Sequence, residues 1–589
     1  VQDLLIYGVT SNSTSKINTS QSTLVTYANT TGATYRNVVV HANGLLASTT
    51  SSRYNILGPM TDNTVVENIF VYMTASNQYR LSNGANIVSF STANSVSSFT
   101  GLDFKNSWAL STSGVTGGVI VEPKMYKVSV LNASVGSDIY YLGFKHSAST
   151  SLSGAGTKAS PYLISSENDL FAFANMINTG KFDGTGTAIN ATYNASGKYY
   201  KLTKDLDISG YLFTPIGTYH LPATVNIESS NFEFKGTFDG DGHVITGLRV
   251  FTYNTRYAGL FGRVASGNIT NINLKNVYIV SGNAEYTGGI VGFTSNANLE
   301  GLTVDGQVLG RNLVGGIVAY FGLTSDKYIA NSGVSGWVHS LGTAGGVVVQ
   351  IPALTSGSAR TANVQYSYNQ ASVVGRGGLE STSYALGGIV GTTDNNQGSV
   401  VQIVISDCYN TGTLYGHGVI GGIMGKLNNT VINNCYSAGT IYVDSLAYWS
   451  GTQTLLSSTT NNPLTAGNFS TTSYAWNTAV ISKVGEIGGY AMQNNVTIVN
   501  SYYVTKLIFA INSSGKTTQI PVGKAGNAGT TPYGISTFTG KVTPAVFYVN
   551  GTGGQSALNL TNQFKAYDGW TLDESFNGGY PTLEWAVGE

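Results

Sequence analysis

The feature that most constrains this chain is a short block, two glycines followed by an aliphatic residue, that recurs through its second half. GGIVG begins at Gly288, GGIVA at Gly315, GGVVV at Gly345, GGIVG at Gly387 and GGIMG at Gly421, and the related AGLFG begins at Ala258. Successive double glycines are 27, 30, 42 and 34 residues apart. A period in this range indicates a repeat architecture, in which stacked units bury a shared core.

Each block is followed by short alternating strands that end in turns, as in NITNINLKNVYIVSG and VINNCYSAGTIYV. Strands of this length without helices between them cannot form βαβ units, but they can wind as coils. We therefore predict an all-β, right-handed parallel β-helix in which equivalent apolar residues stack about 4.8 Å apart. The double glycines would mark corners where a Cβ clashes or φ is positive. An antiparallel β-sandwich is the alternative, although sandwiches do not repeat one block at this period.

A weaker repeat joins the two halves of the chain. In NGLLASTTSSRYNILG and TGLRVFTYNTRYAGLFG, Gly-Leu precedes Arg-Tyr by the same interval. We therefore predict an N-terminal β-solenoid-like domain over residues 1–150, with its next coil at the double glycine Gly117, and a second solenoid over 151–589. The boundary lies in the small-polar stretch HSASTSLSGAGTKAS. Residues 1–34, rich in Ser and Thr, could serve as a donated strand.

One amphipathic helix is predicted, over residues 166–178. Ser166 stands three residues before Asp169, as in a capping box, and Leu170, Phe173 and Ile177 share one face. We expect this helix to cap the open end of the second solenoid, because unpaired strand edges invite aggregation. At the other end, the aromatic segment DGWTLDESFNGGYPTLEW is expected to plug the last coil.

The charge of the chain is low and balanced. Charged residues make up 10% of the 589 residues, with 29 basic and 29 acidic side chains, whereas an ordinary soluble domain has about 25%. This balance gives no electrostatic footprint for nucleic acid. There is no apolar run long enough to span a bilayer, and the start VQDLLIYGVT has neither Met nor a signal pattern, which indicates a processed form or a fragment.

The motifs that carry catalysis or cofactor binding are missing from the sequence. There is no HExxH, no GxSxG and no phosphate-binding GxxxxGK[ST], and the carboxylates are scattered. The densest acidic feature is the turn TFDGDGH, with Asp239, Asp241 and His243, for which turn chemistry is favoured over a weak metal site. We therefore predict a protein that is not an enzyme, with no catalytic residues, no cofactor and no metal.

Two cysteines occupy matching positions of consecutive repeats. Cys408 in DCYNTGTL and Cys435 in NCYSAGTI are 27 residues apart and should stack in neighbouring coils. Stacked Cα atoms lie within disulfide range, so a bridge is geometrically feasible, and a pair of buried free thiols is the alternative.

Glycosylation sequons of the form Asn-x-Ser/Thr are frequent, at about the number expected by chance in a chain so rich in Asn, Ser and Thr. They begin at Asn12, Asn18, Asn29, Asn132, Asn190, Asn194, Asn268, Asn428, Asn468, Asn495, Asn512, Asn550 and Asn559. They permit N-glycosylation at these positions without requiring it.

Several segments together resemble the GLUG-motif family of bacterial and archaeal surface proteins. These are SPYLIS, YYKLTKDLDISG, FTPIGT, FKGTFDGDGHVITGL, AGLFG, the GGIVG blocks with NCYSAGTI, and GGYPTLEW. They cover roughly residues 155 to 586 in order, and less clearly 35 to 135. The resemblance implies a secreted or cell-surface location, in adhesins or in the stalks of surface proteases.

Three functions follow as hypotheses. The first is an extracellular adhesin or structural glycoprotein, whose Tyr and Trp side chains would contact glycans or other cell-surface molecules. The second is a subunit of an extracellular filament or layer that joins copies of itself by strand addition. The third is a β-helix enzyme acting on polysaccharides.

Overall fold

The structure is a computed structural model that describes a long second unit in detail and only backbone strands in the first. The described residues are 149, 151–179, 196–209, 213–218, 233–252, 256–281, 284–310, 312–340, 342–375, 384–394, 398–416, 419–444, 484–492, 495–503, 569–572, 577 and 580–587, with the backbone of strands β1–β11 and β47–β49.

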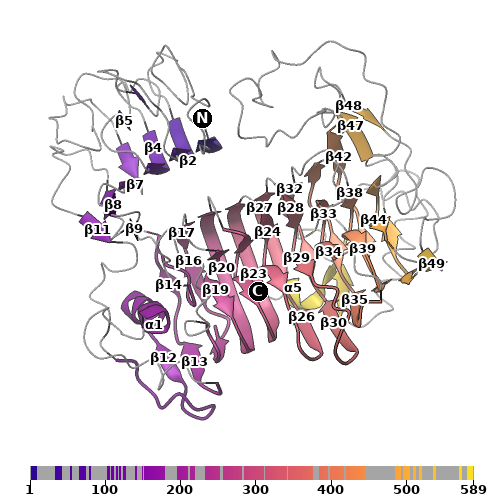
Figure 1. The fold of residues 1–589 in the computed structure, drawn as a ribbon, viewed down its shortest axis with the longest axis horizontal. Helices are drawn as coiled ribbons and strands as arrows, with labels where there is room; N and C mark the ends of the chain where they lie inside the picture. The colour runs from indigo at the N-terminus through magenta and orange to yellow at the C-terminus, as the bar shows by residue number, and fades with distance from the viewer. Residues whose placement is uncertain are drawn as a thin grey trace.

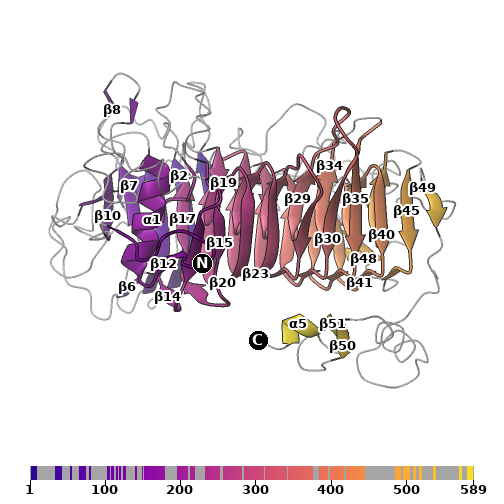
Figure 2. The same ribbon diagram turned by 90° about the horizontal axis from the view of Figure 1, so that it is seen from below.

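The second unit is a parallel β-helix with three long sheets, and Figure 2 shows its coils side by side along one axis. The two narrower sheets have seven strands each. One contains β18 (Tyr257–Ala258), β21 (Tyr286–Gly288), β24 (Leu313–Gly315), β28 (Thr343–Gly345), β33 (Ala385–Gly387), β38 (Val419–Gly421) and β43 (Val484–Gly485). The other contains β19 (Phe261–Val264), β22 (Val291–Thr294), β25 (Val318–Phe321), β29 (Val348–Ile351), β34 (Val390–Thr393), β39 (Met424–Leu427) and β44 (Gly488–Ala491).

The third sheet has 24 strands and forms the widest wall of the rod (Figure 1). It begins with β12 (Tyr162–Ile164), β13 (Tyr199–Leu202), β14 (Leu206–Asp207), β15 (Thr237–Asp239), β16 (Val244–Thr246), β17 (Arg249–Thr252), β20 (Gly267–Ser281), β23 (Ala297–Gly310), β26 (Lys327–Ala330) and β27 (Gly333–Ser340). It continues with β30 (Arg360–Gln365), β31 (Tyr368–Asn369), β32 (Ser372–Gly375), β35 (Val401–Ser406), β36 (Tyr409–Asn410), β37 (Leu414–Gly416), β40 (Thr430–Asn433), β41 (Tyr436–Ser437) and β42 (Ile441–Asp444). It ends with β45 (Val496–Val499), β46 (Tyr502–Tyr503), β47 (Ile508–Ile511), β48 (Thr517–Gln519) and β49 (Ile535–Phe538).

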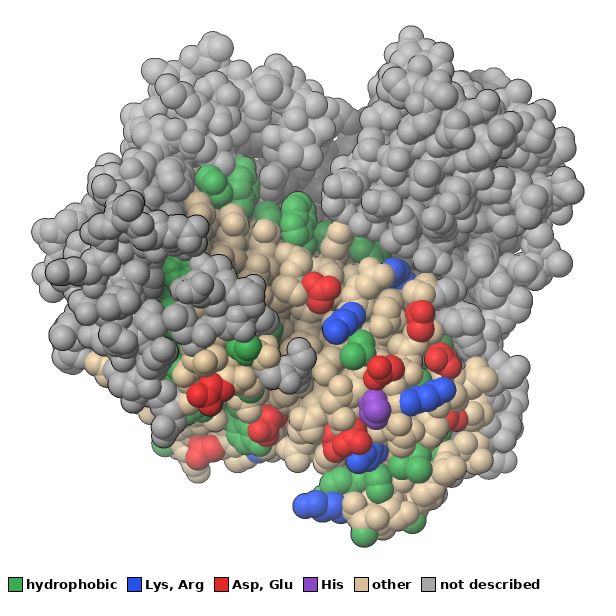
Figure 3. Space-filling model, turned by 180° about the vertical axis from the view of Figure 1, so that it is seen from behind, with side chains coloured by type: hydrophobic (Ala, Val, Ile, Leu, Met, Phe, Trp, Pro, Cys, Tyr) green, Lys and Arg blue, Asp and Glu red, His purple; other side chains and the backbone are tan. Residues whose placement is uncertain are grey.

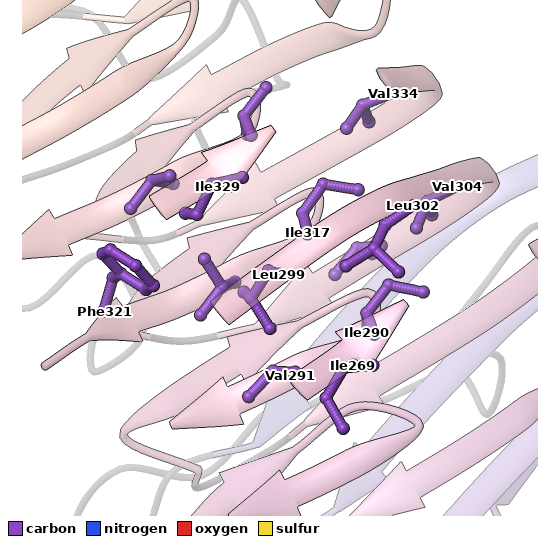
Figure 4. Packing of buried hydrophobic residues seen from close by; sticks show 14 of the residues in the cluster. Ile269, Ile290, Val291, Leu299, Leu302, Val304, Ile317, Phe321, Ile329 and Val334 are labelled. Carbon is purple, nitrogen blue, oxygen red and sulfur yellow. The ribbon is translucent and has the colours of Figure 1, made fainter. Parts of the chain in front are cut away.

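Apolar residues at one register position form a continuous ladder inside the rod. The ladder runs through Phe238, Ile269, Leu299, Ile329, Val364, Ile405, Ile432 and Ile498, and each of these residues is fully buried. Figure 4 shows part of this packing, with Ile269 and Leu299 on successive coils. Because every inward side chain meets its counterpart one coil away, the core is uniform along the axis. The predicted all-β solenoid is confirmed.

The double glycines are required by close approach of the next coil rather than by a positive φ. A Cβ on Gly316 would lie 2.1 Å from the carbonyl oxygen of Gly346, and one on Gly388 would lie 2.0 Å from that of Gly422. The same clash with the equivalent residue one coil on recurs at Gly289 and Gly346. The second glycine of each pair is therefore fixed by coil stacking.

β43, the last described strand of the narrow sheet that begins at β18, is not followed by the second glycine of the pair. Gly485 pairs with Gly421, so Glu486 stands where the preceding coil has Gly422. Among the described strands, β43 ends its sheet, so no following carbonyl forbids a side chain there. Glu486 is nevertheless 5% exposed, and its Oε2 atom has no hydrogen-bond partner. Burial raises the pKa of this carboxyl from 4.5 to about 8.

A column of left-handed residues forms a bend in the wide sheet, one in each coil. Its members are Asn271, Gly301, Asn331, Tyr366, Asp407, Asn434 and Asn500, with φ between 47° and 65°. Asn, Asp and Gly tolerate this conformation, whereas a tyrosine rarely adopts it. Tyr366 is therefore the strained member of the column.

The predicted capping helix is confirmed as α1 (Glu167–Thr179). The Ser166 hydroxyl accepts a hydrogen bond from the Asp169 amide at 3.1 Å, and Asp169 Oδ2 accepts one from the Ser165 amide at 3.0 Å. The fully buried Phe173 ring lies 4.5 Å from the Tyr200 ring and 5.6 Å from the Phe238 ring, measured between centroids. The helix thus packs its apolar side onto the first strands of the rod.

The loop beyond the helix is held by its last turn. The Asn178 side-chain amide donates to the Pro215 carbonyl at 2.9 Å, and its Oδ1 atom accepts from the amides of Gly217 and Thr218 at 2.8 and 2.9 Å. Asn178 is only 6% exposed, so these bonds satisfy an otherwise costly buried amide.

The first unit contains a sheet of its own. Its strands are β1 (Gln2–Gly8), β2 (Thr34–Ala42), β4 (Val65–Met73), β6 (Asp103–Lys105), β7 (Trp108–Ser111), β10 (Lys124–Lys127) and β11 (Ile139–Tyr141), and two further pairs are β3 (Tyr54–Asn55) with β5 (Tyr79–Arg80) and β8 (Val115–Thr116) with β9 (Val119–Ile120).

Two predictions for the first unit need correction. β1 pairs in parallel with β2 of the same chain, so residues 2–8 complete their own sheet and do not form a free donor strand; residues 9–33 lie outside the described residues. β8 and β9, which flank Gly117 in sequence, pair antiparallel, and β10 is antiparallel to both β7 and β11. A tight antiparallel turn uses a double glycine as readily as a solenoid corner does. The parallel ladder therefore stops at β7.

Candidate functional site

Aromatic side chains gather in three places on the described outer surface. The first, here called the outer aromatic cluster, consists of Tyr257, Tyr286, Phe293 and Tyr320, from neighbouring coils. The rings of Tyr257 and Tyr286 are stacked at 5.7 Å, and those of Phe293 and Tyr320 at 4.7 Å, between centroids. Each ring face in these pairs is taken up largely by the adjacent ring.

Two arginines lie over three of the four rings of the outer aromatic cluster. Arg256 lies over the rings of Tyr257 and Tyr286, and Arg263 lies over those of Tyr257 and Phe293. Each arginine is paired with a carboxylate, Arg263 with Glu233 at 2.7 Å and Arg256 with Glu285. Burial raises the pKa of Tyr320 to about 12 and raises the pKa of Tyr286 further still. The charges of the two arginines beside the cluster are thus balanced by Glu233 and Glu285.

The second place is a tyrosine column on the outside of the wide sheet, defined as Tyr368, Tyr409, Tyr436 and Tyr502. The ring of Tyr409 is stacked on that of Tyr368 at 5.3 Å and on that of Tyr436 at 5.2 Å, with interplanar angles of 9° and 4°. Tyr502 follows in register. The column is buried, with Tyr409 and Tyr436 fully so.

The column is covered by the described C-terminal residues 569–572, 577 and 580–587, here called the C-terminal clip. The clip contains β50 (Trp570–Leu572), β51 (Pro581–Leu583), which pair as an antiparallel ribbon, and α5 (Glu584–Val587). Figure 2 shows these elements beside the flank of the rod. Trp570 lies 6.0 Å from the Tyr409 ring, and the Trp585 indole donates to the Tyr366 carbonyl at 2.9 Å.

Asn577 is the polar centre of the C-terminal clip. Its Nδ2 atom donates to the Tyr436 hydroxyl at 2.8 Å, and its Oδ1 atom accepts from Thr411 at 3.0 Å and from Gln370 at 3.3 Å. The Tyr409 hydroxyl is 3.0 Å from that of Thr582. Asn577 is only 6% exposed, so without it the Tyr436 hydroxyl would lose a hydrogen bond, and Thr411 and Gln370 would lose this acceptor.

The predicted plug over the last coil is therefore wrong for the described residues. The aromatic segment covers the side of the rod at the coils of β31, β36 and β41, not its end. The reason is that outward-facing tyrosines in these three coils form a wide apolar strip, which gains more from coverage than the narrow end of one coil does. The prediction identified the segment and missed its target.

The third place consists of two solvent-exposed aromatic side chains that belong to successive coils. Trp337 on β27 and Tyr384 beside β33 are the two large hydrophobic side chains that are exposed in the described part of the chain, at 40% and 38%. Tyr384 packs partly over the backbone of Gly342, since a Cβ there would lie 3.3 Å from its ring. Sequence reasoning passed over Trp337.

On one face of the molecule, the charged side chains of the described residues do not gather into a region of one sign. On the face shown in Figure 3, the Lys, Arg, Asp and Glu side chains of the described residues are scattered among uncharged surface. This agrees with the composition of the sequence, in which 10% of residues are charged. A ligand of this surface would thus be recognised through hydrogen bonds and ring contacts more than by net charge.

The acidic turn of Asp239, Asp241 and His243 is held by local hydrogen bonds. Asp239 Oδ1 accepts from the Asp241 amide at 2.9 Å and from Asn271 at 3.0 Å. Asp241 pairs with Lys201 at 2.8 Å, while the His243 ring contacts Asp205 at 3.1 Å. In this arrangement the carboxylates point to separate partners, as turn chemistry requires.

Cys408 and Cys435 lie in adjacent coils, one residue before the paired Tyr409 and Tyr436. Both are fully buried and are free thiols in this structure, so the bridge considered above is not formed. Cys408 donates to the Ser406 carbonyl at 3.1 Å and Cys435 to the Asn433 carbonyl at 3.2 Å. Burial, with the neighbouring Cys435, raises the pKa of the Cys408 thiol.

We expect these thiols to be unreactive until the chain unfolds. Both thiols are fully buried and out of reach of an alkylating reagent, and the raised pKa of Cys408 leaves it little thiolate. Mass spectrometry after iodoacetamide treatment should find neither cysteine modified in native protein and both modified in 6 M guanidinium chloride without reductant. A pair that stays unmodified in denaturant until reductant is added would show a disulfide instead.

Three of the sequons fall on described residues. Asn428 is 1% exposed and donates to the Asp394 carbonyl at 3.2 Å, so the folded chain has no room for a glycan there. Asn268 accepts from Asn298, and Asn495 is exposed while its Oδ1 atom accepts from the Asn429 amide. The other ten lie outside the described residues.

Comparison with known proteins gives partial matches in sequence. No family model matches the chain. It is 33% identical to halomucin of Haloquadratum walsbyi over 182 residues, which are 29% of this chain and 2% of halomucin. It is 29% identical over 156 residues to a protein of Evansella cellulosilytica provisionally named a Gly-rich membrane protein, covering 26% of this chain and 16% of that one. The chain thus spans a small part of both relatives.

Two solved structures resemble the fold. One is a provisionally assigned immunoglobulin A1 protease from Bacteroides ovatus, 19% identical, with a TM-score of 0.43, covering 75% of this chain and 96% of that one. The other is an IgA1 protease, 15% identical, with a TM-score of 0.34, covering 69% of this chain and 28% of that one.

The prediction that this chain is not an enzyme needs correction. Both structural neighbours are named as proteases, which contradicts it, and we withdraw the prediction. The absence of familiar motifs was its basis, and motif absence excludes only the reactions that those motifs serve. At these identities the likeness concerns the fold, so no catalytic role is assigned to any residue here.

The described residues include the helices α1 and α5. In the part of the chain that the structure describes, neither is long and apolar enough to cross a membrane.

Proposed function

We propose that this chain is an extracellular cell-surface protein that serves in adhesion, with the β-solenoid as a rigid rod and its outer faces as contact surfaces. The in-register pairing of successive coils in the narrow sheets is the observation that carries the proposal. From β18 to β44 the coils present the same three sheets, so the outward residues of these coils are held in rows along the rod. Such a surface suits repeated contacts with an extended ligand.

Further support comes from the way the rod is closed. The helix α1 covers its beginning and the C-terminal clip covers an aromatic strip on its side, which leaves a mostly uncharged polar exterior. The partial likeness to halomucin and to a membrane protein of Evansella favours a surface location. Membership of the GLUG-motif family is part of the same proposal.

Location and adhesion can be tested on intact cells of the source organism. Antibodies against the purified full chain should label unpermeabilised cells, and mild protease treatment should remove the label. Beads coated with the native chain should attach to those cells more than beads coated with the same protein after thermal unfolding. Labelling that requires permeabilisation would refute the surface location, and equal attachment of both bead types would refute adhesion.

A further inference from the structure

The three aromatic places differ in one respect that matters for binding. In the outer aromatic cluster every ring contacts a neighbouring ring, and three of the four also lie under Arg256 or Arg263, while the tyrosine column lies under the C-terminal clip. An aromatic side chain can stack on a ligand only with a face that is free of other contacts. Trp337 is 40% exposed, more than any described aromatic side chain of the other two places.

The orientation of Trp337 is fixed by the backbone before it. Gly336 has a φ of 92°, and a Cβ there would lie 2.1 Å from the carbonyl oxygen of Gly306 in the previous coil. Gly306 itself has a φ of 137°. The two glycines pair in register just before Trp337 and take a backbone conformation that other residues rarely adopt, while the following Val338 points into the core. The indole is therefore held outward on a rigid element.

Short polar side chains surround the indole on the neighbouring coils. Gln307 and Ser372 pair with Trp337 in the register of the wide sheet, one coil before it and one after. Two positions earlier, Asp305 pairs with Ser335, whose hydroxyl donates to the Asp305 carboxylate at 2.7 Å. We call these five residues the Trp337 patch. It joins an apolar ring to carboxamide, carboxylate and hydroxyl groups within about two rungs, or roughly 10 Å.

This set of groups selects a class of ligand. The C–H face of a pyranose ring is apolar and stacks on an aromatic ring, while its hydroxyls exchange hydrogen bonds with amides and carboxylates. Asp305, the charged member of the Trp337 patch, disfavours a polyanion because like charges repel. The coil spacing repeats along the rod, so an extended chain of sugars can follow the sheet surface.

We propose that the Trp337 patch is a binding site for an uncharged hexose polymer, with the Trp337 indole stacking on one sugar and Gln307, Ser372 and Asp305 holding its hydroxyls. This inference rests on the proposed adhesive function and names the ligand class and the residues for it.

Native affinity electrophoresis of the full chain tests the site. The gels contain amylose, dextran, soluble cellulose oligosaccharides or galactomannan as neutral probes, and dextran sulfate as the polyanion. At least one neutral probe should retard the native protein, and dextran sulfate should not. Trp337→Ala should weaken that binding at least tenfold, while Trp337→Phe, which keeps a smaller ring, should weaken it less.

Tyr384→Ala is the matched control, because it removes an aromatic side chain of nearly equal exposure outside the patch. It should leave the retardation unchanged. Circular dichroism should show the native strand signal in all three variants. The proposed site would be overturned if neutral probes retarded Trp337→Ala as strongly as the wild type. It would also be overturned if no neutral probe retarded the native chain.

The coated-bead experiment separates the two proposals. If native beads attach to cells while Trp337→Ala leaves polysaccharide retardation intact, the site is wrong and the adhesive function stands. If native beads fail to attach although neutral polysaccharide retards the chain in a Trp337-dependent way, the site is right and the adhesive function fails.

Discussion

Glu486→Gln is expected to raise the free energy of unfolding at pH 9 by an amount on the order of 3 kcal/mol, and to change it little at pH 5. The cause is the buried carboxyl that replaces the second glycine of the pair in the last described coil. Its Oε2 atom has no hydrogen-bond partner, so ionisation inside the rod is costly. Gln keeps the shape of the side chain and never ionises.

The sign follows from the two pKa values of the carboxyl. In the folded chain its pKa is about 8, because of burial, against an ordinary value of 4.5. Between these values the folded state keeps a proton that the unfolded state has lost. The contribution of Glu486 to stability is thus fully present below pH 4.5 and is lost as the pH rises through about 8.

Urea denaturation of both proteins at several pH values, followed by circular dichroism, measures this effect. Hydrogen exchange of residues 484–503 would show whether the change is local to the last coil. Glu300→Gln, which neutralises a carboxyl on the outside of the rod, is the control and should not alter the pH profile in this way. Parallel profiles of wild type and Glu486→Gln would contradict the prediction.

Deletion of residues 569–589 should destabilise the rod on the order of 5 kcal/mol, because it exposes the tyrosine column and removes its polar contacts. Asn577→Ala should have part of this effect, about 2–3 kcal/mol, since it leaves the Tyr436 hydroxyl and two other partners without their amide. Both changes should increase binding of an environment-sensitive dye, and Asn577→Ala should also speed proteolysis at the clip.

Thr571→Ala serves as the control inside the same ribbon. Thr571 is partly exposed on β50, and its replacement should change the free energy of unfolding by less than about 0.5 kcal/mol. A truncated chain as stable as the full one, without increased dye binding, would mean that the clip does not cover the column in solution.

The sequence predicted the fold because the solenoid repeats its constraints. A Cβ on the second glycine of each pair would clash with a carbonyl of the next coil, so glycine is required there once per coil. This requirement appears in the sequence as a regular repeat. The helix was equally accessible, because Ser166, Asp169 and the apolar face form a local pattern. Features that depend on one coil and its neighbours were therefore predictable.

Contacts between distant segments were not. Nothing in the sequence near Asn577 says that it bonds to Tyr436, 141 positions earlier, and the aromatic end was therefore assigned to the wrong surface. Two single-residue features were visible in principle. Aligning the coils shows Glu486 in GEIGG where the others have glycine, and Trp337 beside an outward Ser335 in GVSGWVHS.

The matching register of successive coils also has a consequence for how such a protein changes over time. A coil touches only the coil before it and the coil after it, through the same pairs of positions. Duplication or loss of one whole coil outside the three that the C-terminal clip covers would therefore join surfaces that already fit, leaving α1, the clip and the Glu486 coil in their places. Reach from the surface would change in steps of about 4.8 Å per coil without any new interface. Length is the property of this molecule that evolution can adjust most freely.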